Sequence, residues 1–263
     1  GFSSAGQIII AQFIGSGHQE GVKKTIGSMF TLLLSMALGM SVICYFLRDT
    51  LLQLVNTPAE AYEYTMQYTV ICIAGLVFIY GYNIVSAIMR GMGDSKRPFM
   101  FIAIAAVINT VLDILFVAFL DMGVSGAALA TVIGQSFSFL FALYYLYRHK
   151  ESFGFDFRLE SFKLHKQTVS KIFSLGIPMA LQSAAVSISM TVVAAWVNSF
   201  GVVASAIAGI ISKLNMMVGI LSNALTTAAA SMVGQNLGAR KYDRIPKILG
   251  VTIISSSVVA VVC

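Results

Sequence analysis

This sequence is poor in charge. Only 11% of its 263 residues are Asp, Glu, Lys or Arg, whereas a soluble domain of ordinary size carries about 25%. Histidine and cysteine are also scarce, with three of each, and the cysteines lie far apart in apolar runs. Their spacing provides no disulfide framework and no set of metal ligands. Hydrophobic residues make up 57% of the chain, and this excess indicates a membrane protein.

The hydrophobic residues are gathered into long runs. A helix that crosses a bilayer needs about 20 mostly apolar residues. We expect six complete crossings, at residues 26–47, 68–89, 99–120, 127–147, 172–197 and 203–233. The runs 2–14 and 248–263 are expected to be incomplete crossings, because the chain begins with Gly1 and ends within an apolar run. The sequence therefore predicts an all-α polytopic membrane protein, truncated at both ends.

The loops between these runs alternate in charge. Cytoplasmic loops of membrane proteins carry an excess of Lys and Arg, and every second loop here is basic. These basic loops hold 15 of the 17 Lys and Arg residues: Lys23, Lys24, Arg90, Lys96, Arg97, Arg148, Lys150, Arg158, Lys163, Lys166, Lys171, Arg240, Lys241, Arg244 and Lys247. We therefore expect these loops to be cytoplasmic, so the net charge of +6 orients the chain and does not indicate nucleic-acid binding. The expected location is the plasma membrane, specifically the bacterial inner membrane.

A short pattern occurs twice in the chain. Residues 12–15 and 235–238 both read Gln-x-x-Gly, and each is followed by a lysine and a further glycine at one constant offset of 223 residues. Both copies occur at the cytoplasmic end of a predicted crossing, which favours a parallel repeat of the kind found in several transporter folds. We therefore expect two pseudo-symmetric lobes, with residues 1–147 in the first and 172–263 in the second.

Residues 148–171 form the predicted cytoplasmic linker between the lobes. Four phenylalanines alternate with charged residues there: Phe153, Phe155, Phe157 and Phe162. Such amphipathic segments can lie in the plane of a membrane surface, so we expect the linker to rest on the cytoplasmic face of the bilayer.

One carboxylate occurs inside a predicted crossing. Asp113 interrupts the run 99–120, and an acid within the membrane is a functional-site hypothesis because its burial costs several kcal/mol. Asn109 lies one helical turn earlier on the same face. Thr131, on the next crossing, lies at a similar depth of about 10 Å below the outer surface, as judged from the turn at 121–125. Carboxylate, amide and hydroxyl oxygens suit a proton or Na⁺, so Asp113, Asn109 and Thr131 form the predicted cation site. The structural alternative is a buried Asp that only joins two helices by hydrogen bonds.

Other polar groups in the crossings are open to two interpretations. Lys213 is the other charge within a crossing, and it is either a gating or substrate-repelling group or a lysine that packs against backbone carbonyls. Gln182 and Asn198 either line a cavity or gate, or only pack between helices, and the sequence favours neither role. No Asp or Glu occurs between Glu160 and Asp243, so this part of the chain supplies no carboxylate ligand within the membrane.

An ordered set of motifs carries a family resemblance. The set is Gln12-x-x-Gly15, Arg90-Gly-Met-Gly93-Asp94-Ser-Lys96-Arg-Pro98, Asn109-x-x-x-Asp113, Gly123-x-x-Gly126-Ala127-Ala128-x-Ala130-Thr131, Gly176-Ile-Pro178 and Gly234-Gln235-Asn-Leu-Gly238-Ala239. Taken in this order, the motifs resemble the multidrug and toxic compound extrusion (MATE) family. The resemblance runs through the whole chain, from helix 2 to helix 9 of the family's twelve.

The resemblance implies a fold of two six-helix lobes around a central cavity, and an antiporter that works by alternating access with Na⁺ or H⁺. In one branch of the family the cation site maps onto Asn109, Asp113 and Thr131, with a further Asp on a first helix that this chain lacks. Another branch has an acidic residue on helix 7, where this chain has none. The implied substrates are amphipathic or cationic drugs, and no cofactor is expected beyond the coupling ion. Its other expected partner is the lipid bilayer, and the complete protein is expected to be monomeric.

Two other functions stay open at this stage. The first is a lipid-linked oligosaccharide flippase of the same superfamily, which is expected to have a more cationic cavity than Lys213 alone provides. The second is an intramembrane enzyme, which needs a nucleophile and base or metal ligands at membrane depth. No histidine lies in a predicted crossing, so we do not expect an enzyme.

Overall fold

The computed structural model describes residues 1–54, 59–198 and 200–262, and these residues form helices without any strand. Seven of the described helices are long and apolar enough to cross a membrane, which confirms the all-α membrane fold. The long helices are α2 (Gln19–Leu54), α3 (Ala59–Gly91), α4 (Lys96–Asp113) continued by a π-helix (Ile114–Phe119), α5 (Gly123–Arg148), α7 (Lys166–Asn198), α8 (Val202–Gly238) and α9 (Ile245–Val262). The shorter helices are α1 (Phe2–Gly15), α6 (Lys150–Phe153) and the 3-10 turns Leu159–Phe162 and Tyr242–Arg244.

Most helices extend beyond the apolar runs from which they were predicted. The run 26–47, for example, lies within α2, which covers Gln19–Leu54. A helix satisfies its own backbone hydrogen bonds, so it continues past the apolar run into polar residues. The predicted turn after the third crossing is present, with Asp121 (φ 52°) and Gly123 (φ 53°) both in the left-handed region.

The contacts divide the chain into two compact units. Unit 1 contains residues 1–22, 91–93 and 170–263, and unit 2 contains residues 23–90 and 94–169. These units therefore group α1 with α7–α9, and the segment 148–169 with α2–α5. The predicted lobes 1–147 and 172–263 with their linker stay a prediction about the complete protein.

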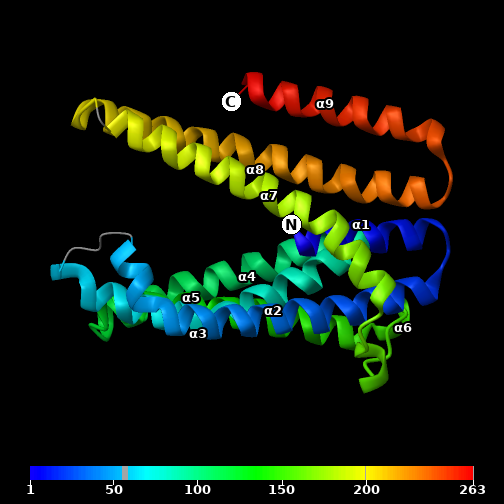
Figure 1. The fold of residues 1–263 in the computed structure, drawn as a ribbon, viewed down its shortest axis with the longest axis horizontal. Helices are drawn as coiled ribbons and strands as arrows, with labels where there is room; N and C mark the ends of the chain where they lie inside the picture. Colours follow the sequence, from blue (N-terminus) through cyan, green and yellow to red (C-terminus); the bar gives the residue numbers. More distant parts are fainter. Residues whose placement is uncertain (55–58, 199, 263) are drawn as a thin grey trace. The chain divides into compact units, whose positions relative to one another are not determined.

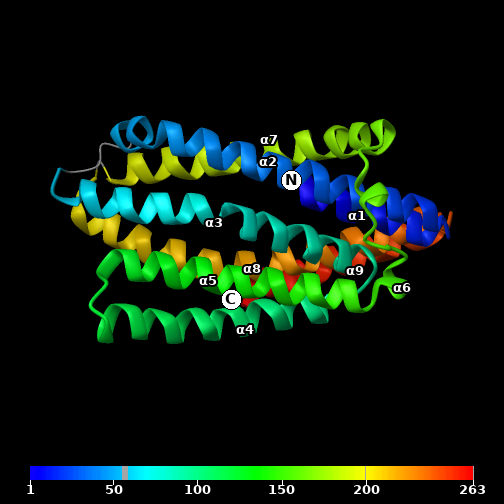
Figure 2. The same cartoon turned by 90° about the horizontal axis from the view of Figure 1, so that it is seen from below.

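In unit 2, α5 lies between α3 and α4 (Figure 2). Glycines bring the helices together: the ring of Phe139 on α5 lies over Gly81 on α3. Gly134 on α5 lies against Asn109 on α4, where a Cβ would come within 3.1 Å of the Asn109 Cβ. The α4–α5 pair is therefore packed tightly at the level of the predicted cation site.

In unit 1, α1 packs against α8 through the repeated motif (Figure 1). A Cβ on Gly15 would overlap the backbone carbonyl of Gln235, and a Cβ on Gly238 would overlap the backbone carbonyl of Gln12. Each copy of Gln-x-x-Gly therefore supplies a glycine that admits the carbonyl of the other copy. The repeat was found in the sequence as a constant spacing. This reciprocal contact shows that it has a packing role in unit 1.

A glutamine side chain adds to the same contact. The Gln7 amide on α1 donates hydrogen bonds to the Ser231 hydroxyl (2.8 Å) and the Thr227 carbonyl (3.2 Å) on α8. Because both partners of Gln7 lie on α8 and Gln7 is only 2% exposed, these bonds reinforce the α1–α8 contact.

The predicted linker packs on α2, and its place on the membrane surface stays a prediction. Phe153 and Phe155 are buried, and Phe155 stacks on Phe30 of α2 with ring centroids 6.3 Å apart. The carbonyl of Ser161 lies where a Cβ on Gly27 would be. These phenylalanines therefore pack against protein, Phe155 on Phe30 of α2 and Phe153 on Tyr145 of α5.

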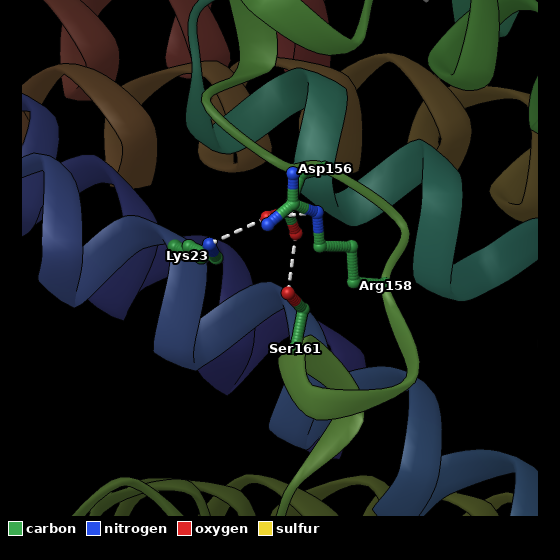
Figure 3. A network of polar contacts seen from close by, with 4 residues as sticks. All are labelled: Lys23, Asp156, Arg158 and Ser161. Atoms are coloured by element: carbon green, nitrogen blue, oxygen red, sulfur yellow. Dashed lines mark hydrogen bonds and ion pairs between the residues drawn. The ribbon is translucent and has the colours of Figure 1, made fainter.

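An ion-pair network closes this contact (Figure 3). The Asp156 carboxylate accepts hydrogen bonds from the Lys23 ammonium of α2, at 2.9 Å, and from the Ser161 hydroxyl. The Arg158 guanidinium lies 3.7 Å from the same carboxylate. The Ser161 hydroxyl and the Lys23 ammonium hold the pKa of Asp156 well below its usual range, because both interactions favour the charged form.

Candidate functional site

Asp113 lies at a change in helix geometry. It is the last residue of α4, and the π-helix Ile114–Phe119 follows it directly. Along this segment the Leu120 N–H donates to the Leu115 carbonyl at 3.0 Å, one residue further back than in an α-helix. π-helical segments are rare and occur frequently at functional sites. The widened turn therefore singles out Asp113 independently of its charge.

The Asp113 carboxylate is incompletely satisfied. Its Oδ1 atom is buried and has no hydrogen-bond partner among the described residues. The Tyr68 hydroxyl on α3 lies within electrostatic reach of the carboxylate. A buried oxygen that lacks a partner carries the full cost of leaving water, and uptake of a proton or a small cation would remove much of that cost. The arrangement therefore suits reversible binding of such an ion.

Asn109 and Thr131 meet at one cavity. The cavity lies between α4 and α5, has a volume of about 130 Å³ and is lined by both residues. The Asn109 Nδ2 atom is buried without a hydrogen-bond partner in the part of the chain that the structure describes. Asp113 follows Asn109 by one turn on α4, so all three residues of the predicted site belong to one region of the α4–α5 pair.

The Thr131 hydroxyl does not donate to Asp113. Its hydrogen bond goes to the Ala127 carbonyl, one turn earlier on α5, at 3.0 Å. This back-bonding is common for threonines within helices. The oxygen of the hydroxyl stays free to accept or to ligate, so Thr131 contributes to the cavity rather than to a direct bond with the acid.

The other predicted residues belong to unit 1. Gln182 on α7 and Lys213 on α8 are exposed in this chain, and Asn198 ends α7 with a side chain outside the described residues. Next to Lys213, Ser212 lines a cavity of about 500 Å³ between α7 and α8, together with Met190, Thr191, Val193, Val197 and Ala208. The cavity or gating role of Lys213, Gln182 and Asn198 stays a prediction.

Sequence reasoning missed Gln135 and Tyr68. Gln135 lines the 130 Å³ cavity beside Asn109 and Thr131. A signal for it was present, since Gln135 follows Thr131 by four residues and so lies on the same face of the helix. Tyr68 had no such signal, because only the packing of α3 brings its hydroxyl within electrostatic reach of the acid.

Comparison with known proteins gives consistent results. The family model MatE matches residues 1–115 and 178–263. The chain is 32% identical over 249 residues to the Probable multidrug resistance protein YpnP of Bacillus subtilis, covering 93% of this chain and 54% of that protein. It is 25% identical over 264 residues to the Multidrug export protein MepA of Staphylococcus haemolyticus, covering 100% of this chain and 57% of that protein. The chain thus spans little more than half the length of the curated relatives it matches.

Solved structures show the same fold. A MATE crystal structure in the bent conformation superposes with a TM-score of 0.89 at 23% identity, over 99% of this chain and 58% of that one. A mutant of the Vibrio cholerae MATE transporter VcmN superposes with a TM-score of 0.85 at 20% identity, over 94% of this chain and 56% of that one. With its ordered motifs, its membrane-spanning helices and the extent of the family match, the chain belongs to the MatE family, the multidrug and toxic compound extrusion transporters.

Proposed function

We propose that the protein carrying this sequence is a cation-coupled antiporter that exports amphipathic or cationic drugs by alternating access. The observation that carries the proposal is the Asp113 carboxylate, whose buried Oδ1 lacks a hydrogen-bond partner among the described residues at the start of a π-helix. Drug export is supported by the relatives named as multidrug resistance and multidrug export proteins. We place the complete protein in the bacterial inner membrane, acting as a monomer.

The coupling ion would act by neutralising Asp113. An ionised carboxylate buried without a partner is unfavourable, so the empty site favours whichever conformation lets water reach the acid. When Na⁺ or H⁺ is bound, the carboxylate and the ion together are neutral. The conformation that keeps Asp113 away from water is then no longer destabilised by an uncompensated charge. The ion can change the balance between two conformations only to the extent that it binds one better than the other. The buried Oδ1 of Asp113, which lacks a partner among the described residues, would supply that difference.

The cavity between α7 and α8 suits a drug-like substrate. Its lining combines Met190, Val193 and Val197 with the hydroxyls of Thr191 and Ser212, and its volume of about 500 Å³ is in the range of small-molecule sites. A flexible methionine among apolar side chains accommodates ligands of different shapes. We therefore assign hydrophobic substrate contacts to this cavity.

The test is dye efflux by the full-length protein and by its Asp113→Asn variant, with external Na⁺ and pH varied separately. The amide keeps the size of the side chain but cannot be charged, so we expect the dependence of efflux on the cation to be lost. Dependence on pH alone in the unmodified protein would assign the proton, and dependence on Na⁺ at fixed pH would assign sodium. Unchanged efflux and unchanged cation dependence in the variant would refute cation coupling at Asp113.

A matched threonine pair tests the role of the cavity. Thr131→Val removes a hydroxyl that lines the cavity, and Thr110→Val removes an exposed one on α4; each hydroxyl donates to the carbonyl four residues earlier. We expect Thr131→Val to raise the cation concentration for half-maximal efflux several-fold, because one oxygen ligand is lost, and Thr110→Val to leave it unchanged. Equal effects of the two variants would show that the hydroxyl serves only its own helix.

A further inference from the structure

One leucine of the predicted linker is held away from the protein. Leu159 opens the 3-10 turn Leu159–Phe162 and is 92% exposed. The turn is fixed on α2, because Ser161 is buried and the Thr31 hydroxyl of α2 donates to the Phe162 carbonyl at 2.5 Å. Leu159 belongs to none of the candidate crossings among the described residues, so the hydrocarbon core of the bilayer does not account for its exposure. The fold therefore presents an apolar side chain on a rigid turn.

This turn lies at the level where α2 enters its apolar run. The Ser161 carbonyl lies where a Cβ on Gly27 would be, and Thr31 makes its bond to the turn one helical turn further along α2. Gly27 and Thr31 belong to the start of the run 26–47 that is predicted to cross the bilayer, and Lys23 lies just before that run. A change from basic to apolar residues marks the cytoplasmic interface of a membrane helix. The turn is therefore at the depth of the lipid headgroups.

The exposed surface of the linker is basic. Five basic side chains and two acidic ones are exposed between residues 148 and 167: Arg148, Lys150, Arg158, Lys163 and Lys166 against Glu151 and Glu160. The third acid, Asp156, is paired with Lys23 at 2.9 Å. A second apolar side chain, Leu164, is 53% exposed next to Lys163. Basic residues close to a membrane surface attract anionic lipids, so charge and apolar exposure point to the same partner.

We propose that residues 158–164 are a docking surface for anionic phospholipids of the cytoplasmic leaflet, with Leu159 as the apolar anchor. Leu159 enters the boundary between headgroups and acyl chains, and Arg158 and Lys163 bind the headgroup phosphates, a combination typical of elements that lie in the membrane interface. Because the turn is already fixed on α2, docking requires little further ordering of the chain. The phenylalanines of the linker are not the anchor, since Phe155 packs on α2. The proposal does not depend on cation coupling at Asp113.

The test uses the full-length protein reconstituted in phosphatidylcholine vesicles that contain an increasing fraction of phosphatidylglycerol. A single cysteine introduced by Leu159→Cys, in a background whose native cysteines are changed to serine, carries an environment-sensitive fluorophore. Ser152→Cys provides the control, at an exposed polar position of the same linker. The emission maximum and quenching by lipids spin-labelled near the headgroup are measured. We expect the label at position 159 to be quenched and blue-shifted increasingly as phosphatidylglycerol is added, and the label at position 152 to stay in water.

A matched lysine pair separates local charge from net charge. Lys163 and Lys241 are both exposed in basic loops, but only Lys163 belongs to the proposed docking surface. We expect Lys163→Gln to raise the phosphatidylglycerol fraction for half-maximal quenching at position 159 about fivefold, which corresponds to about 1 kcal/mol per basic residue at an anionic surface. We expect Lys241→Gln to leave this fraction unchanged.

Four results would overturn the docking surface. A label at position 159 that behaves like the label at position 152 shows that Leu159 meets water. A blue shift without lipid quenching shows that Leu159 contacts another part of the complete protein. Equal quenching with and without phosphatidylglycerol shows that the surface does not recognise anionic lipid. Equal effects of Lys163→Gln and Lys241→Gln show that only the net charge matters. None of these results bears on Asp113, whose role is measured by the cation dependence of efflux.

Discussion

Two aspartates of unit 2 show how much the surroundings of one side chain matter. Asp156 is partly exposed and accepts hydrogen bonds from Lys23 and Ser161, so its charge is well satisfied. Asp113 lies in an apolar helix with a buried oxygen that has no partner among the described residues. The first acid therefore holds two segments together, whereas the second is the residue that we propose to bind the coupling ion. We assign the proposed function to Asp113, because its buried oxygen has no hydrogen-bond partner among the described residues.

Asp156→Asn tests the structural role of the first acid. The folded-state pKa of Asp156 is depressed below its ordinary value of 3.8, so its contribution to stability is present above that pH and is lost as the pH falls through the lower, folded-state value. We expect the variant to melt a few degrees lower than the unmodified protein, by the same amount from pH 5 to 8, with the difference shrinking below about pH 4. Thermal unfolding in detergent across this range is the measurement. A difference that disappears already between pH 5 and 8 would contradict the assignment.

At the scale of elements, helix pairs here are specified by glycines. The pairs α1–α8, α3–α5 and α4–α5 each contain a glycine where a Cβ would collide with, or press closely on, the neighbouring helix. In a membrane the hydrophobic effect does not distinguish helix from lipid, so close backbone approach supplies much of the association energy. Gly15 and Gly238 are the strongest examples, because each admits a backbone carbonyl that cannot move aside.

Gly238→Ala, compared with Gly219→Ala in the same helix, tests this packing. A Cβ at Gly238 would overlap the Gln12 carbonyl, whereas nothing lies within 4 Å of a Cβ at Gly219. We expect Gly238→Ala to destabilise the protein by about 1–3 kcal/mol through overpacking. Gly219→Ala is expected to be neutral or slightly stabilising, because alanine favours a helix. Melting temperatures in detergent measure both, and similar values for the two variants would argue against a tight α1–α8 contact.

At the scale of the whole molecule, orientation is set by charge. The loops between the seven candidate crossings are alternately basic and poor in Lys and Arg, and this alternation predicts residues 148–171 in the cytoplasm and the turn at Asp121 outside. The alternation persists through every crossing, so a single inverted helix would bring several lysines and arginines to the wrong side of the membrane.

Single cysteines introduced by Asp121→Cys and Lys150→Cys test the orientation. The background carries Cys44, Cys72 and Cys263 changed to serine. We expect a membrane-impermeant maleimide to label position 121 in intact cells and position 150 only after permeabilisation, because the reagent reaches only the outer face. Mass-tagged gel shifts report the labelling, and the reverse pattern would show the opposite orientation.

The crossings and the family could be predicted from the sequence, which also singled out three residues of the candidate site whose role stays a prediction. Run length and loop charge are properties of the chain taken in order, and they identified the crossings that the structure bears out as helices. Asp113, Asn109 and Thr131 were found by depth along the helices, which needs only the helical rise. The inward packing of Phe153 and Phe155 was not predicted, because an aromatic residue among charges fits a membrane surface and a protein surface equally well.

The linear pattern of apolar and charged residues was thus enough to establish a multi-pass helical protein, its expected orientation and its family. Three features emerged only from folding: the π-helix after Asp113, the bond from Thr131 to Ala127, and the cavity that joins Gln135 to Asn109. The physical reason is that a helix which is apolar on all sides carries no period to show which side meets its neighbour. That choice depends on small local features, such as Gly134 against Asn109, whose consequences appear when the helices come together.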